Sequence, residues 1–194
     1  MGELIHNDKS KFKEAILYIV DNFPNKNLNK TKLYKVLFLA DFAYFKQYGK
    51  SITNTFYLHH RHGPVPEIGE NILNEMNDQD LEISRILDDS FIEYRFKNLR
   101  NPDKQMFEEN ELNFINRYMK FCGDKTAIKL SEVTHKMDLY KLTKQGERIP
   151  YALVFYDVED DLIDDEELDE IEKEILFSDE MLTDIRKFTS EQQI

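Results

Sequence analysis

Residues 30–49 read KTKLYKVLFLADFAYFKQYG, and past its first turn this stretch is apolar around most of a helical circumference. Asn29 stands where a helix N-cap is favoured, and Gly49 stands where helices commonly end. The stretch therefore predicts a helix over residues 29–48. A helix that is apolar on all sides belongs in the centre of a fold, so we expect the rest of the chain to pack around it.

Asp41 is the exception within this apolar helix. A carboxylate on a buried helix must find hydrogen-bond donors or a cation, or its pKa must shift. The simplest interpretation is a structural ion pair in the core. A functional carboxylate is the alternative, because perturbed carboxylates also gather at functional sites.

The surrounding segments predict an α+β fold that is predominantly α-helical, with a central apolar helix and a small antiparallel β-sheet. Apolar periodicity indicates further helices over residues 11–23, 66–76, 108–122 and 126–135. Alternating apolar residues over 81–87 and 91–99 indicate a β-hairpin, and residues 55–60 are β-prone. We expect a loop over residues 136–151 and packed apolar side chains over residues 152–156.

Charge divides the chain into a near-neutral part and an acidic part. The formal net charge is −12, and residues 157–180 hold fourteen acids against one base. We therefore expect one domain over residues 1–156 and an acidic extension over residues 157–194. The single cysteine, Cys122, argues against a disulfide framework and lies where a buried thiol is expected. With no apolar run near the roughly 20 residues that cross a bilayer, we expect a cytoplasmic protein with no membrane partner.

The acidic extension carries its own apolar pattern. Leu168, Ile171 and Ile175 recur at helical spacing, which predicts an amphipathic helix. Such a helix could be a solvated acidic tail, pack on the core's own lysines, or bind a basic surface of a partner.

Three of the five histidines lie in HHRHGPVPE, residues 59–67. In a strand, His60 and His62 point to the same side and could bind one metal ion. The remaining ligands would come from Glu67, His6 or His135. No HExxH motif, cysteine pair or Gly-rich phosphate loop accompanies them. A metal-dependent enzyme using residues 59–62 is thus one hypothesis, and a non-enzymatic protein without a cofactor is the interpretation we prefer.

Lysines cluster around the start of the predicted central helix, at positions 26, 30, 32 and 35. A basic patch of this kind can contact nucleic acid, but the acidity of the chain as a whole argues against such a partner. We expect these lysines to be solvated and available to a protein.

Together these motifs resemble the Panacea domain, also called the SocA-like antitoxin domain. The matching segments are LNKTKLYKVLFLADF at 28–42, HHRHGPVP at 59–66, LSEVTH at 130–135 and GERIPY at 146–151. The resemblance covers about residues 10–156. Relatives often have tyrosine where His62 stands, and tryptophan near the position of Tyr140. Both replacements keep a large ring, which favours packing or an interface over proton chemistry.

The resemblance implies a bacterial or prophage antitoxin that neutralises a toxin encoded nearby by direct protein–protein binding. A proteolytic adaptor that delivers the toxin to a protease is the alternative. The expected site is the surface around the start of the central helix and the Gly-Pro corner, with the acidic extension as a second contact. Candidate partner-binding residues are Lys32, Lys35, Asp41, His60, His62, Gly63, Pro64, His135, Leu168, Ile171 and Ile175.

Overall fold

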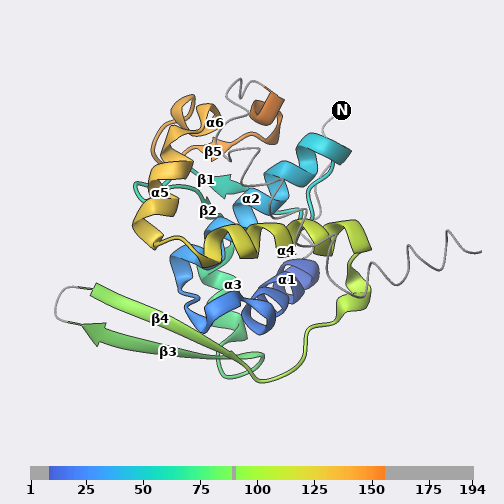
Figure 1. Ribbon diagram of the computed structural model, residues 1–194, viewed down its shortest axis with the longest axis vertical. Coiled ribbons are helices and arrows are strands. Elements are labelled where there is room, and N and C mark those ends of the chain that lie inside the picture. Colours follow the sequence, from blue (N-terminus) through green and yellow to red (C-terminus); the bar gives the residue numbers. More distant parts are fainter. Residues whose placement is uncertain (1–8, 89–90, 156–194) are drawn as a thin grey trace, which may run out of the picture. The chain divides into compact units, whose positions relative to one another are not determined.

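The predicted central helix is the core of the molecule (Figure 1). A computed structural model describes residues 9–88 and 91–155. In it α2 runs over Lys30–Tyr48. The Asn29 side chain accepts a hydrogen bond from the Lys32 backbone N–H at 3.0 Å, and Gly49 ends the helix with a φ of 69°. Both caps and the helix itself are therefore confirmed.

Three further helices pack around α2. They are α1 (Lys9–Asn22), α3 (Gly69–Met76) and α4 (Glu109–Gly123). Among the pairs of helices, α2 and α4 make the most extensive contact, and the Cys122 thiol of α4 is fully buried as expected. The short 3-10 turn η1 (Pro24–Lys26) follows α1, and a second one, η2 (Lys104–Met106), precedes α4. The expected start of α3 at residue 66 is wrong, because Pro66 is paired in a strand.

Two small antiparallel sheets complete the α+β fold. The first has the order β2 (Val65–Pro66), β1 (Tyr57–Leu58), β5 (Arg148–Ile149), with Tyr57 opposite both Pro66 and Ile149. The second is the predicted hairpin of β3 (Leu81–Asp88) and β4 (Phe91–Asn98), which extends beyond the helices in Figure 1. The three-stranded sheet thus joins segments about 90 residues apart.

The segment after α4 differs in part from the sequence prediction. Helix α5 (Ala127–Lys136) forms as predicted, with Thr126 as its N-cap. The loop expected after it contains a short helix, α6 (Asp138–Lys141). The 3-10 helix η3 covers Tyr151–Phe155, but Val154 is buried whereas Phe155 is 60% exposed. Residues 152–155 are therefore only partly packed.

An ion pair between a buried carboxylate and a partly exposed arginine ties the hairpin region to α1. Glu14 of α1 is 7% exposed and accepts hydrogen bonds from Arg100 at 2.6 and 3.1 Å. Arg100 also contacts Asp80, and the backbone N–H of Asp103 donates to Glu14 at 2.7 Å. This network fixes the chain just before and just after the hairpin.

The acidic extension lies outside the described residues, so its amphipathic helix, its Leu168, Ile171 and Ile175 face and the domain boundary remain predictions. Among the residues described, no helix is both long enough and apolar enough to span a bilayer.

Candidate functional site

The Gly-Pro corner is the turn between β1 and β2, at residues 59–64. The backbone N–H of Gly63 donates to the His60 carbonyl at 2.6 Å and closes the turn. The side chains of His60, Arg61 and His62 are exposed, whereas Gly63 and Pro64 are buried. The corner therefore presents three polar side chains on a tip whose base is packed into the protein.

Three helices hold the backbone of this corner through alternate carbonyl groups. The Tyr140 hydroxyl of α6 donates to the His60 carbonyl at 2.7 Å. The Ser131 hydroxyl of α5 donates to the His62 carbonyl at 3.0 Å, and the Lys35 ammonium of α2 donates to the Pro64 carbonyl at 3.4 Å. Support from three separate elements makes the corner a preorganised feature rather than a free loop.

Gly63 is required at the corner for two reasons. Its φ is +93°, in the region that L side chains rarely adopt. A Cβ atom there would lie 2.1 Å from the Lys35 Nζ and 2.6 Å from the Thr134 hydroxyl oxygen. The missing side chain therefore leaves the space in which the Lys35 ammonium sits.

The two candidate lysines are internal, which corrects the expectation that they are solvated. Lys32 is 4% exposed and Lys35 is 1% exposed. The Lys32 ammonium donates to the Asn27 side chain at 3.0 Å and to the Gly123 carbonyl at 3.1 Å. Burial lowers the pKa of Lys32 and lowers that of Lys35 to about 7. Both lysines bind backbone carbonyls inside the fold.

Beside the corner, Tyr140 stacks on two histidines. Its ring centroid lies 3.7 Å from that of His59 and 4.7 Å from that of His135. His59 also contacts the Thr143 hydroxyl through Nδ1 at 3.1 Å. The Nε2 atom of His135 is buried without a hydrogen-bond partner in the described residues, and burial lowers the pKa of this histidine. Tyr140 is thus a packing residue, whereas His62 is exposed.

Asp41 is fully buried and binds donors rather than a cation. Its carboxylate accepts hydrogen bonds from the backbone N–H groups of Ile52 and Thr53, both at 2.9 Å. The hydroxyls of Thr53 and Tyr57 donate to it at 2.5 and 2.7 Å. The expected ion pair is therefore wrong. Burial raises the pKa of Asp41, and the four donors offset part of that rise.

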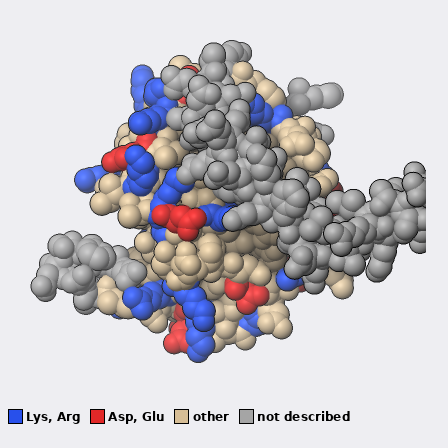
Figure 2. Space-filling view, viewed as in Figure 1, with Lys and Arg blue, Asp and Glu red and all other residues tan. Residues whose placement is uncertain are grey.

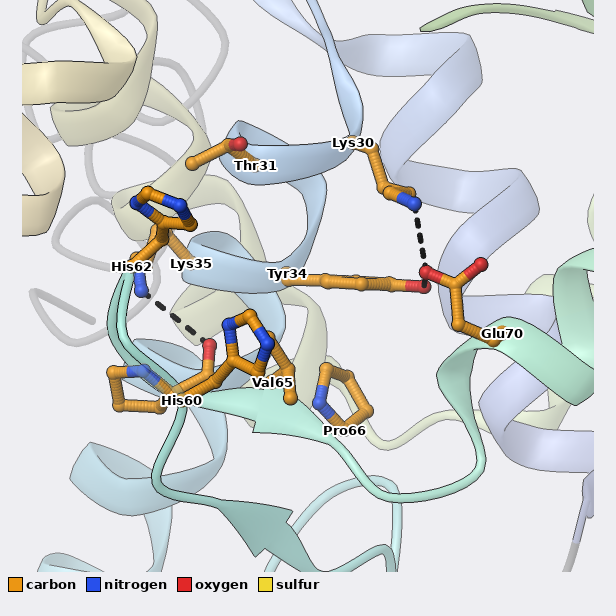
Figure 3. Close-up of a pocket in the computed structure, with 10 residues that line it drawn as sticks. Lys30, Thr31, Tyr34, Lys35, His60, His62, Val65, Pro66 and Glu70 are labelled. Atoms are coloured by element: carbon orange, nitrogen blue, oxygen red, sulfur yellow. Dashed lines mark hydrogen bonds and ion pairs between the residues drawn. The ribbon is translucent and has the colours of Figure 1, made fainter. Parts of the chain in front are cut away.

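A pocket of about 260 Å³ opens between the start of α2 and the corner (Figure 3). Figure 3 shows His60 and His62 on one side, the Lys30–Glu70 ion pair on the other, and the Tyr34 ring between them. The lining residues are Lys30, Thr31, Tyr34, Lys35, His60, His62, Pro64, Val65, Pro66 and Glu70. Two of the exposed corner side chains and the helix that carries Lys35 therefore line the same pocket.

A family model described as "Antitoxin SocA-like, Panacea domain" matches residues 33–140 of this chain. That range includes most of α2, the corner, α5 and Tyr140. The chain belongs to the SocA-like Panacea family. No curated protein and no solved structure gives a match.

The Panacea domain brings together most of the candidate residues, but in different roles. Lys35, Gly63 and Pro64 form the buried base of the corner, and His60 and His62 form its exposed tip. His135 lies beside this group against Tyr140. Lys32 and Asp41 bind other segments, at Gly123 and at residues 52–57.

Sequence reasoning missed Tyr34, Ser131 and Thr134 as members of the site. Ser131 and Thr134 belong to the LSEVTH motif that carries the family resemblance, and Tyr34 lies in the motif of the central helix. Their place in these motifs could have identified them as site residues, because a hydroxyl within an otherwise apolar helical segment needs a hydrogen-bond partner.

The histidines do not form a metal centre in the described part of the Panacea domain. No group of three or more His, Cys, Asp or Glu side chains there could hold an ion. The ring centroids of His60 and His62 are 6.1 Å apart, while Glu67 binds Arg148 at 2.7 Å. Of the residues proposed as further ligands, Glu67 is thus engaged elsewhere, His135 is stacked on Tyr140, and His6 lies outside the described ranges.

The surface next to the corner is basic. Residues 125–148, which include α5 and α6, hold six Lys or Arg against three Asp or Glu. Figure 2 shows these elements at the upper left, where lysine and arginine outnumber the acids. A partner bound at the corner of the Panacea domain would therefore approach a positively charged surface.

Proposed function

We propose that this protein is a bacterial or prophage antitoxin that neutralises a toxin encoded beside it by direct binding. Membership of an antitoxin-like family supports the class of function. One observation carries the assignment of the site: the corner exposes His60, Arg61 and His62 on a backbone held by three helices. A contact surface that is already ordered loses little conformational entropy on binding.

In this proposal the protein acts in the cytoplasm without catalysis or a cofactor. Lys35, Gly63 and Pro64 set the shape of the corner, and His60 and His62 contact the toxin. Lys32, Asp41 and His135 hold the surrounding segments in place. The acidic extension, through Leu168, Ile171 and Ile175, adds affinity for the toxin.

Co-expression with the product of the adjacent gene tests the function. The wild-type chain should restore growth of a bacterial host that this product inhibits. Replacing His60, Arg61 and His62 together by alanine should abolish rescue, while the control Glu82→Ala/Lys97→Ala, at an exposed ion pair on the hairpin, should rescue fully. Rescue by the corner variant equal to wild type would reject the corner as the contact.

The same cells distinguish sequestration from proteolytic delivery. Direct neutralisation predicts that the toxin persists and co-purifies with this protein. If the toxin instead disappears, and reappears in a host that lacks its ATP-dependent proteases, the protein is an adaptor. Replacing Leu168, Ile171 and Ile175 by serine in the full chain tests the extension, which we expect to weaken co-purification.

A further inference from the structure

The pocket beside the corner is lined by two lysines and two histidines against one acid. Its one acid, Glu70, already binds the Lys30 ammonium at 2.7 Å and the Tyr34 hydroxyl at 3.3 Å. In residues 9–88 and 91–155, no carboxylate forms an ion pair with Lys35, whose ammonium donates a hydrogen bond to the Pro64 carbonyl at 3.4 Å. Two imidazoles, His60 and His62, complete the polar rim. An anion would therefore find hydrogen-bond donors here, whereas the one carboxylate that could bind a cation is already paired.

The remaining walls of the pocket are apolar. Val65, Pro64, Pro66 and the ring of Tyr34 line it. Its volume of about 260 Å³ is below the roughly 300–1,000 Å³ of sites that bind whole small molecules. An apolar wall with donors at one side suits a short aliphatic stem that ends in a charged group.

The pocket and the proposed interface share residues. His60 and His62 belong both to the exposed tip of the corner and to the pocket lining. A protein that contacts the tip would consequently cover the pocket. The neighbouring surface of α5 and α6, where bases outnumber acids, favours a partner whose own surface is acidic.

From this geometry we propose that the pocket receives an aspartate or glutamate side chain of the bound protein, with the carboxylate at His60 and His62 and the aliphatic stem against Tyr34 and Val65. This inference rests on the proposed function for the source of the side chain. It assigns the corner a defined chemical specificity, namely a protruding acid on the toxin.

Binding of a small probe to the full chain tests the chemistry of the pocket without the toxin. The probe is N-acetylglutamate with its α-carboxyl group amidated, the neutral control is N-acetylglutamine amidated in the same way, and the signals are the imidazole resonances of His60 and His62 in NMR spectra. We expect saturable shifts with the acid and binding about ten-fold or more weaker for the amide, since a hydrogen bond to a charged group is stronger than one to a neutral group.

Matched variants locate the binding. The exposed pair His60→Gln/His62→Gln should weaken acid binding about ten-fold. Lys97→Gln, at an exposed ion pair on the hairpin, also removes a full positive charge but does not line the pocket, so it should leave the affinity within about two-fold. Equal binding of acid and amide, equal weakening by both variants, or tighter binding of inorganic phosphate than of the acid would overturn the assignment.

The cell assay then separates this inference from the proposed function. We expect His60→Gln/His62→Gln to lose rescue and Lys97→Gln to retain it. If the wild-type chain fails to rescue, the proposed function fails and the probe experiment alone decides the pocket. If the wild type rescues but the acid probe does not bind, the pocket inference is rejected and the function stands.

Discussion

Replacing Gly63 by alanine should destabilise the domain more than the same change at any other turn glycine with a similar backbone. At φ +93° an alanine costs about 1–2 kcal/mol of conformational strain. Its Cβ would also lie 2.1 Å from the Lys35 Nζ, so the ammonium must move and lose its buried carbonyl partner. That loss adds about 1–3 kcal/mol. We therefore expect a total cost of about 2–5 kcal/mol in the free energy of unfolding.

Gly146 provides the matched control, because its φ is +86° and a Cβ there would meet nothing within 4 Å. Gly146→Ala should cost only the strain, about 1–2 kcal/mol. Urea unfolding followed by tyrosine near-UV circular dichroism measures both, since the chain has ten tyrosines and no tryptophan. When Lys35→Met is present, the amount by which Gly63→Ala destabilises the protein more than Gly146→Ala should fall by about 1 kcal/mol or more. Equal costs at Gly63 and Gly146 would refute the close packing of Lys35 under the corner.

Three further substitutions test the buried polar network by the same unfolding measurement. Burial lowers the pKa of Lys35 to about 7 in the folded chain. Between about pH 7 and about pH 8.5 the unfolded chain therefore binds more protons than the folded chain. The free energy of unfolding of the wild type should rise over this range, by at most about 1.4 kcal/mol per pH unit. Lys35→Met should remove this rise, and equal pH slopes in the wild type and the variant would contradict the burial of the Lys35 charge. The pH range ends below the ordinary pKa of Cys122, because titration of that thiol would lower the stability as the pH rises. Arg100→Met should cost about 1–2 kcal/mol because it leaves a buried carboxylate without its cation, whereas Lys97→Met, at an exposed ion pair, should cost less than about 0.5 kcal/mol; similar costs would argue against the network. Tyr151→Phe removes a hydroxyl that donates to a backbone carbonyl at 2.9 Å and should cost about 0.5–1.5 kcal/mol, so an unchanged midpoint would show that this bond contributes nothing.

Local signals explain which parts of the fold were predictable. The central helix follows from apolar residues around its circumference and from caps at Asn29 and Gly49, all of which lie within the segment itself. The start of α3 was wrong because Pro66 pairs with Tyr57 across the sheet, a contact that periodicity does not register. Helix α6 was missed because its four residues are too short to show a helical repeat.

The candidate site was predictable as a set of segments but not as a set of roles. The motifs that carry the family resemblance do converge at the corner. The burial of Lys32 and Lys35, however, depends on carbonyl acceptors at Gly123 and Pro64, which come from other elements. Asp41 likewise finds its donors in a following segment instead of a cation. Partners distant in sequence decided whether each charged residue is a surface group or an internal one.

The Lys35 ammonium and the hydroxyls of Ser131 and Tyr140 hold the corner at the carbonyl oxygens of residues 60, 62 and 64, and every residue type carries a carbonyl oxygen. The side chains at positions 60–62 can therefore be exchanged while Lys35, Ser131 and Tyr140 keep the same partners. Such an arrangement separates the architecture of the corner from its recognition chemistry. Under the proposed function, such domains could change their partner specificity at the three tip positions without refolding the protein beneath.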